Sequence, residues 1–152
     1  MRDLSLHILD IAENSIRAGA KRVEISLRDD LSNDLLTLEI ADDGTGMDPA
    51  IRRRAARPFF TSKADRRIGL GLSLLEQATK EAGGRFDIAS TPGEGTRITA
   101  TFRFSHPDRK PIGDVAATLE ALVAGNPGVG FRYERRSGMD LDVFDTREVG
   151  CR

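Results

Sequence analysis

The chain has 152 residues, 39% of them hydrophobic and 31% charged, which predicts one soluble domain with at most a small appendage. The net charge of −1 gives no field that would recruit nucleic acid or an anionic membrane, and 5% aromatic residues without Trp argue against a stacking platform for single strands. The single cysteine, Cys151, excludes a disulfide within the chain and favours a reducing, cytoplasmic location. No apolar run reaches about 18 residues and no signal peptide opens the chain, so no membrane segment is expected.

Hydrophobic periodicity divides the chain into helices and strands. The helical period predicts helices at 4–18, 70–82 and 114–125, and a short helix at 48–56 that opens on Asp48 and Pro49. Period-two alternation predicts strands at 21–28, 35–41, 85–90, 96–104, 130–136 and 139–145, the first two forming a hairpin. Segment 57–68 is basic and has neither period, so we expect a mobile loop there, and 105–111 reads as a linker. Helices interspersed with antiparallel strands predict a two-layer α/β sandwich.

The first predicted helix carries a polar stripe. Asp10 and Asn14 are four residues apart and share one helical face, which Arg17 joins at the next step of three. A carboxylate, an amide and a guanidinium in line suit a site for Mg²⁺, water and phosphate. The alternative is an ordinary solvated face of an amphipathic helix, and the stripe alone does not decide between the two.

Two glycine-rich turns accompany this helix. Asp42, Gly44 and Gly46 follow the second strand, and Gly69 and Gly71 stand at the start of the next long helix. A helix that opens on glycines can present its free N–H groups to phosphate oxygens. Each turn alone is weak, because such glycines also serve simple turns or close helix–sheet packing. The chain has no GxxxxGK[ST] sequence, so it is not a P-loop protein.

Taken in order, these segments resemble the GHKL ATPase superfamily, which includes gyrase, heat-shock chaperones, histidine kinases and MutL. DIAENSIRAGA is similar to the N box, ADDGTGM to the G1 box, IGLGLSLL to the G2 box, STPGEGTRITATF to the final strand pair, and RPFFTSK to the F box and lid of histidine kinases. The resemblance covers about residues 4–104. It implies an α/β (α+β) fold of the Bergerat type, with a mixed, mostly antiparallel sheet and helices on one face. It also implies ATP and Mg²⁺ as ligands.

The resemblance assigns roles to individual residues. Asn14 matches the Mg²⁺-binding Asn, and Asp42 matches the Asp that accepts a hydrogen bond from the adenine amino group. Around the same nucleotide, the matches are Gly44 and Gly46 for the adenine pocket and lid hinge, Thr96 for the adenine–water network, Gly69 and Gly71 for the phosphate side, Arg17 and Lys63 as basic phosphate contacts, and Met47, Leu70 and Leu72 for the remaining lining. A buried Asp42 needs a donor, which adenine supplies and guanine, with an oxygen at that position, does not.

The sequence departs from the family pattern at two points. Asp10 stands where gyrase- and MutL-type members carry a Glu that polarises water, and its side chain is one methylene shorter. Asp10 is still the candidate general base, because Glu13 lies about 100° around the helix from Asn14. Arg67-Ile68 replaces the usual Gly-Thr before the second glycine motif, which puts lid closure in question.

Three functions follow from the resemblance. The first is phosphoryl transfer to a separate partner protein, as in a stand-alone kinase or an anti-sigma-like regulator, and the kinase-like lid favours it. The second is an ATP-hydrolysing switch of the MutL or gyrase type, which Asp10 favours. The third is a non-catalytic nucleotide-sensing module, which Arg67-Ile68 favours. ATP or ADP and a protein partner are expected ligands, homodimer formation is left open, and neither nucleic acid nor membrane is expected.

The resemblance leaves three features unassigned. His7 shares the face of Asn14 two turns earlier, where it would either approach phosphates or, as we favour, be a surface or packing histidine, and His106 has no expected role. We assign 1–105 to the ATP-binding domain and 106–152 to a C-terminal α-β-β extension of unknown role. Covering an open sheet edge, forming a dimer face and recognising a partner are its alternatives. Deleting 106–152 is expected to spare ATP binding, and unfolding would instead make it part of the core.

Overall fold

The computed structural model describes residues 3–45 and 66–146. The elements are α1 (Leu4–Arg17), β1 (Arg22–Asp30), β2 (Leu35–Asp42), α3 (Arg66–Glu81), β3 (Phe86–Thr91), β4 (Gly95–Arg103), α4 (Val115–Gly125), β5 (Gly130–Ser137) and β6 (Asp140–Asp145). The short helix expected at 48–56 and the part of the basic loop at 57–65 lie outside the described residues. Within the described ranges, no helix is both long and apolar enough to cross a membrane.

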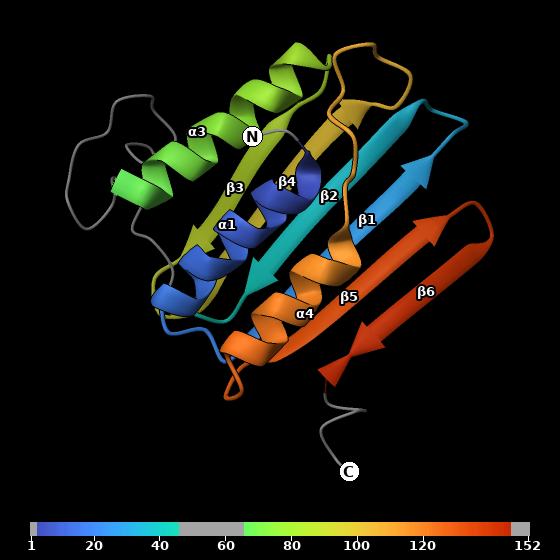
Figure 1. Ribbon diagram of the computed structural model, residues 1–152. Coiled ribbons are helices and arrows are strands. Elements are labelled where there is room, and N and C mark those ends of the chain that lie inside the picture. The colour runs from blue at the N-terminus through green and yellow to red at the C-terminus, as the bar shows by residue number, and fades with distance from the viewer. Residues whose placement is uncertain (1–2, 46–65, 147–152) are drawn as a thin grey trace.

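All six described strands form one sheet, in the order β3-β4-β2-β1-β5-β6. Neighbouring strands pair antiparallel, with the exception of β1 and β5, which run parallel. Helices α1, α3 and α4 lie side by side over one face of this sheet (Figure 1). The predicted two-layer fold with a mixed, mostly antiparallel sheet and helices on one face is therefore confirmed, as is the β1–β2 hairpin.

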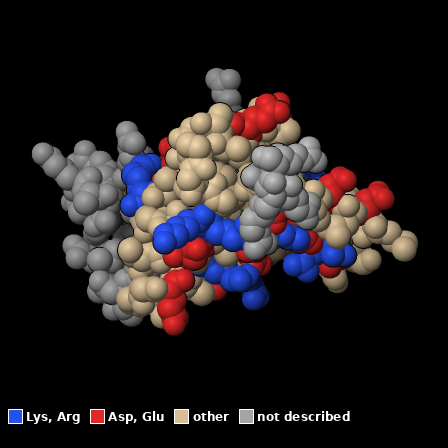
Figure 2. Space-filling model, turned by 90° about the horizontal axis from the view of Figure 1, so that it is seen from below, with Lys and Arg blue, Asp and Glu red and all other residues tan. Residues whose placement is uncertain are grey.

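The core lies between the helices and the sheet because the strands alternate as predicted. Val23, Ile25 and Leu27 on β1 are at most 1% exposed and point toward the helices. The opposite face of β1, β2 and β4 is mostly polar, and Arg97 pairs there with Glu39. Basic and acidic side chains are also interspersed on the surface seen from below (Figure 2), in keeping with the small net charge.

The C-terminal segment shares this core. Its buried apolar side chains are Val115, Leu119, Leu122 and Phe131, none more than 6% exposed. The linker before α4 also holds the start of α1, because the Leu4 N–H donates to the Pro111 carbonyl at 2.9 Å and the Ser5 N–H to the Ile112 carbonyl at 2.8 Å. These contacts satisfy N–H groups that a helix start leaves without an intrahelical partner. The segment at 106–146 thus extends the sheet and contacts the helix that carries the polar stripe. The boundary at residues 105 and 106 stays a prediction.

Helix α3 begins at Arg66, four residues before the predicted start at residue 70. The predicted loop at 57–68 therefore overlaps the first residues of the helix, and Gly69, which the prediction placed ahead of the helix, lies within α3. The loop was predicted because residues 57–68 are basic and show neither period. The close approach of α1 and α3 at Gly71, described below, accounts for a glycine at that position.

Candidate functional site

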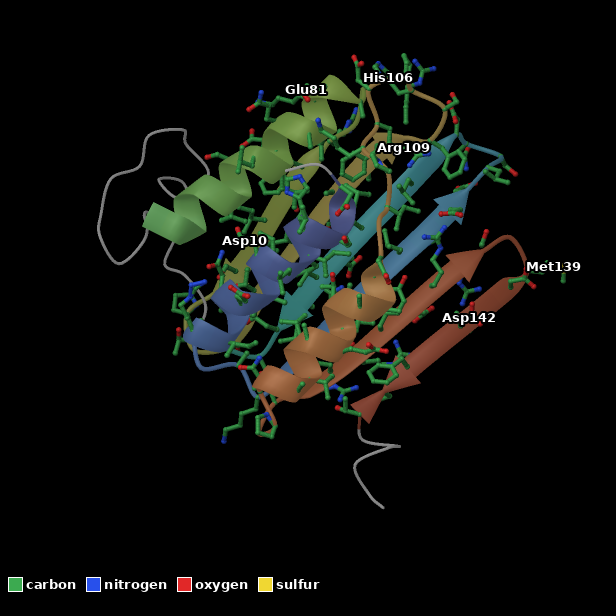
Figure 3. The ribbon with its side chains drawn as sticks, in the orientation of Figure 1. Asp10, Glu81, His106, Arg109, Met139 and Asp142 are labelled. Carbon is green, nitrogen blue, oxygen red and sulfur yellow. The ribbon has the colours of Figure 1, made fainter. Side chains whose placement is uncertain are left out.

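Helix α1 holds Asp10 and Asn14 against the start of α3. Asp3 caps the start of this helix, because its Oδ1 accepts a hydrogen bond from the Leu6 N–H at 3.1 Å, and the helix ends before Gly19, which adopts a φ of 80°. A Cβ atom placed on Gly71 would overlap Asp10 Oδ2 and would lie 3.7 Å from Asn14 Nδ2. Asp10 lies on the α3 side of α1 (Figure 3). Two motifs separated by some 60 residues in the chain thus meet at one point.

The side chain of Asn14 is buried, and no described residue forms a hydrogen bond with it. Asn14 is 8% exposed, and neither its Oδ1 nor its Nδ2 has a hydrogen-bond partner among the described residues. An unsatisfied buried polar group costs about 1–3 kcal/mol, so this amide is suited to a ligand that supplies both a donor and an acceptor. Its oxygen is the type of ligand that Mg²⁺ takes, and the neighbouring Asp10 adds negative charge. The residues at this point therefore fit a hydrated cation with its phosphates.

The end of β2 is fixed to the end of α1 through Asp42. The Ser15 hydroxyl donates to Asp42 Oδ2 at 2.6 Å, and the Gly44 N–H donates to Asp42 Oδ1 at 2.9 Å. A Cβ atom on Gly44 would lie 2.9 Å from the Ala18 carbonyl oxygen, so this turn has no room for a larger residue. The Thr45 N–H donates to the same carbonyl at 2.9 Å. The carboxylate of Asp42 is thus held at one orientation beside α1.

Strand β4 brings Thr96 beside Asp42. The two residues are register partners in the antiparallel β2–β4 pair. The Thr96 hydroxyl lies 2.9 Å from the Ser90 hydroxyl on β3. The preceding Gly95 has a φ of 127°, and a Cβ atom there would overlap the Asp42 carbonyl oxygen, so glycine is required. The structure therefore brings together Asp42 and Thr96, two residues that the sequence assigned to one adenine pocket.

Sequence reasoning missed two residues of this region. Ser15 follows Asn14 directly but points to Asp42 instead of α3, and its hydroxyl is 2.6 Å from that carboxylate. Asp43 accepts hydrogen bonds from the N–H groups of Lys21 and Arg22 at 2.8 and 2.9 Å. Burial alone would raise the pKa of Asp43, but these backbone donors hold it below its ordinary value. Asp42 and Asp43 are adjacent in the sequence, and only their hydrogen-bond partners in the structure distinguish the candidate site residue, Asp42, from the structural residue, Asp43.

The other predicted site residues have different positions. Arg17 forms an ion pair with Glu13 at 3.7 Å and lines a surface hollow with Ile16 and Asn126, so its phosphate role stays a prediction. Leu72 is 1% exposed in the hydrophobic core. Gly46, Met47 and Lys63 lie outside the described residues, and Gly69 and Leu70 lie in the first turns of α3, where only the backbone is described.

His7 is a buried residue, so of the surface and packing positions that we expected, the structure supports packing. It is 2% exposed, lies beside Leu74 and Lys110, and its Nδ1 has no hydrogen-bond partner among the described residues. Desolvation by burial, with a smaller contribution from the positive charge of Lys110, lowers the pKa of His7 from 6.5 to about 4. The imidazole is therefore neutral in the folded protein at neutral pH. His106, in the linker, accepts a hydrogen bond from the Asp108 N–H at 3.0 Å through Nδ1.

The buried His7 predicts a loss of stability in mild acid. The pKa of His7 is lower in the folded protein than in the unfolded chain, so the unfolded chain binds the proton more readily. The contribution of His7 to the free energy of unfolding therefore falls as the pH drops from about 6.5 to about 4. The full loss amounts to roughly 3 kcal/mol, and urea unfolding across this range measures it. Because carboxylates also titrate there, the reference is His7→Gln, whose profile is expected to be flatter by that amount. If the stability of the unmodified chain and of His7→Gln changed in parallel with pH, His7 would bind protons equally well in the folded and unfolded states.

Comparison with known proteins adds three findings. The family model "Histidine kinase-, DNA gyrase B-, and HSP90-like ATPase" matches residues 2–106. The chain is similar to the non-motile and phage-resistance protein of Caulobacter vibrioides, with 33% identity over 119 residues, and to the sensor histidine kinase YxdK of Bacillus subtilis, with 30% identity over 104 residues. These matches cover 72% and 65% of this chain but only 14% and 32% of the relatives, so the chain spans a third or less of their length.

A solved structure agrees with the fold. The Aquifex aeolicus MutL ATPase domain complexed with ADP matches 95% of this chain and 63% of its own, with a TM-score of 0.63 and 16% sequence identity. At this identity, the likeness concerns the fold alone. Because the match covers nearly all of the chain, it includes most of the C-terminal segment that the family model leaves out.

Proposed function

Because the chain belongs to the family of histidine kinase-, DNA gyrase B- and HSP90-like ATPases, we propose that it binds Mg²⁺-ATP between α1, the end of β2 and the start of α3. We further propose that it uses ATP for phosphoryl transfer to a separate partner protein. The observation that carries the proposal is the buried amide of Asn14, which has no partner among the described residues and lies beside Asp10 and Gly71. The MutL domain with this fold was solved with ADP, which supports the choice of nucleotide.

In this proposal the two ends of the nucleotide contact different elements. Asp42 accepts a hydrogen bond from the adenine amino group, while Ser15 and the Gly44 N–H hold the carboxylate in place. Asn14 would hold Mg²⁺ through Oδ1, and glycine at position 71 lets the Asp10 carboxylate lie directly against α3 beside it. When bound, Mg²⁺ neutralises charge on the phosphates. Phosphoryl transfer needs mainly positioning and charge stabilisation, so a pocket with few chemical groups is sufficient.

The second candidate function is an ATP-hydrolysing switch, and Asp10 favours it. The Asp10 carboxylate lies at the contact between α1 and Gly71, where it could orient a water molecule toward the phosphates. In a kinase, Asp10 would act on the acceptor hydroxyl or imidazole of the partner instead of on water. A nucleotide-sensing module without turnover is the third alternative.

A single time course separates these functions. The purified protein is incubated with Mg²⁺ and γ-labelled ATP, alone and with a lysate fraction as a source of acceptors, while protein-bound label and free phosphate are followed together. Label on a second protein supports the kinase, and free phosphate without label supports the switch. ATP binding without either product supports the sensing module. An Asn14→Asp variant tests that any product requires the buried amide.

Ser15→Ala is expected to weaken ATP binding about ten-fold. The substitution removes a 2.6 Å hydrogen bond to a carboxylate, and bonds to charged groups contribute about 1.5–3 kcal/mol. Isothermal titration calorimetry measures the change, and Ser26→Ala on the opposite face of the sheet is the matched control. An unchanged affinity for Ser15→Ala would show that Asp42 does not depend on this bond for its orientation.

Gly71→Ala is expected to preserve the fold but reduce turnover. The new methyl group would overlap the Asp10 carboxylate, which can rotate away only by leaving its place beside Asn14. The helix itself gains from the change, since alanine is the better helix former by roughly 1 kcal/mol. Thermal unfolding and the phosphate time course, measured on the same sample, give both results. Full turnover in Gly71→Ala would remove Asp10 from the catalytic step.

A further inference from the structure

The exposed large apolar side chains of the described residues are concentrated at one edge of the sheet. Leu141, Val143 and Phe144 on β6 are 47%, 45% and 37% exposed, and Met139 in the turn before β6 is fully exposed. Elsewhere in the described ranges, only Leu6 and Leu31 are comparable. Met139 and Asp142 lie on the opposite side of the molecule from Asp10 (Figure 3). Exposed apolar groups that cluster in this way mark interaction sites.

Strand β6 is one of the two ends of the sheet, and β3 is the other. The outer backbone groups of an edge strand are available for pairing with another strand. The two edges differ in their side chains. On β3 the large apolar residues Phe86 and Ile88 pack against the core, whereas on β6 they remain exposed. Of the two edges, β6 therefore has the properties of a docking edge.

The pleat of β6 places Asp140 and Asp142 on one face of the sheet and Leu141 and Val143 on the other. Asp142 and Asp140 are register partners of Arg135 and Ser137 on β5. Both β5 residues lie on the helix side of the sheet, where the Arg135 guanidinium donates to Asp29 Oδ2 at 2.7 Å and the Ser137 hydroxyl donates to the same oxygen at 3.1 Å. Since successive side chains alternate between faces, the two aspartates share the helix side.

Leu141 and Val143 then lie on the open face of the sheet, next to Arg136 and Glu134. Within the described part of the chain, Asp140 and Asp142 form no ion pair, in contrast to Asp145, which pairs with Arg22 at 2.9 Å. Strand β6 thus presents Leu141 and Val143 on the open face, and Asp140 and Asp142 together with the partly exposed Phe144 on the helix side.

We propose that β6 is the docking edge for an extended segment of another protein in which apolar residues alternate with Lys or Arg. A strand added beside β6 places alternate side chains on the two faces. Its apolar residues would contact Leu141 and Val143, and its basic residues would face Asp140 and Asp142. Main-chain hydrogen bonds supply the affinity, and the contacts with these apolar and acidic side chains supply the specificity.

Charge argues against a second copy of this chain as the occupant. Strand β6 contains three aspartates and no basic residue. Antiparallel pairing of two copies about Asp142 would set the two Asp142 carboxylates directly opposite each other, which is destabilising. Pairing about Val143 avoids that contact, but the added copy of β6 then brings no basic side chain to Asp140 or Asp142. A basic strand removes this cost.

The test uses the full chain and two synthetic seven-residue peptides, KVKVKVK and EVEVEVE, which share valines and differ in charge. Binding is followed at low salt by fluorescence anisotropy, and the contact site is mapped by amide chemical shifts in ¹⁵N-labelled protein. KVKVKVK is expected to bind saturably and to shift the amides of 140–145. Asp142→Lys is expected to weaken KVKVKVK by about five-fold and to strengthen EVEVEVE by a similar factor. Asp140→Lys serves as a second variant of the same kind.

The control is Asp87→Lys on the β3 edge, which is expected to change neither affinity. Four results would overturn the proposal. The first two are a lack of saturable KVKVKVK binding at millimolar concentration, and amide shifts on β3 or α1 in place of β6. The other two are an Asp142→Lys substitution that leaves the affinity for each peptide unchanged, and a concentration-dependent dimer whose 140–145 amides are protected. The last result would assign the edge to a second copy of the chain.

Discussion

Asp42→Asn is expected to lower the affinity for ATP about 100-fold while the protein stays folded. In the structure, Asp42 accepts hydrogen bonds from the Ser15 hydroxyl and the Gly44 N–H, and in the proposed complex it accepts a further one from adenine. An Asn side chain has only one acceptor atom, so at least one of these donors loses its partner. The loss of one bond to a carboxylate, of about 1.5–3 kcal/mol, corresponds to a factor of roughly 10–150. Calorimetric titration with ATP measures it.

The neighbouring Asp43 provides the matched control. Asp43→Asn makes the same chemical change one residue away, where the carboxylate accepts from the N–H groups of Lys21 and Arg22. We expect Asp43→Asn to lower stability and to leave ATP affinity within about two-fold. GTP should bind both proteins poorly. Equal losses of ATP affinity in the two variants would mean that Asp42 acts through the fold of the turn and makes no contact with the base.

The fold was predictable from the sequence as far as local pattern determines it. The alternation in 21–28 and 35–41 specifies two half-buried strands, and the turn at 31–34 joins them antiparallel, as the register of Val23 with Asp42 shows. The parallel pairing of β1 with β5 could not be predicted in the same way, because the two strands are separated by about 100 residues. Such a pairing depends on how α4 packs against α1, and no local signal encodes that.

In the candidate site, too, the local sequence pattern predicts some features and tertiary packing decides the others. The spacing of Asp10 and Asn14 predicts that they share a face of α1, and the structure places both beside Gly71. Which side chains complete the site depends on tertiary contacts. Ser15 is one residue after Asn14 on the same helix, yet it points to Asp42, because the end of β2 approaches α1 at that position. The start of α3 at Arg66 was missed because residues 66–68 belong to a basic stretch that shows no helical period, so no local signal extends the helix to that point.

Phe131→Ala is expected to cost about 3–5 kcal/mol of folding free energy, the largest single stability effect among these predictions. Phe131 lies on β5, is 0% exposed, and belongs to the same core cluster as Ile25 and Leu27 of β1. Removing its ring leaves a cavity at the point where the C-terminal segment joins the sheet. Urea unfolding followed by circular dichroism measures the loss, and ATP affinity measured below the transition reports whether the site survives.

Phe144→Ala is the matched control, because it removes the same ring from an exposed position on the adjacent strand β6, where Phe144 is 37% exposed. It is expected to change stability by less than about 1 kcal/mol. A large cost for Phe131→Ala, with one cooperative transition, would mean that residues 106–146 fold together with the nucleotide site, so that a chain ending at residue 105 would lose part of its core. A small cost would support the sequence-based prediction that the segment can be deleted while ATP binding is retained. The two outcomes therefore decide whether a partner bound at β6 acts on a separate module or on the same cooperative unit that holds Asp10 and Asn14.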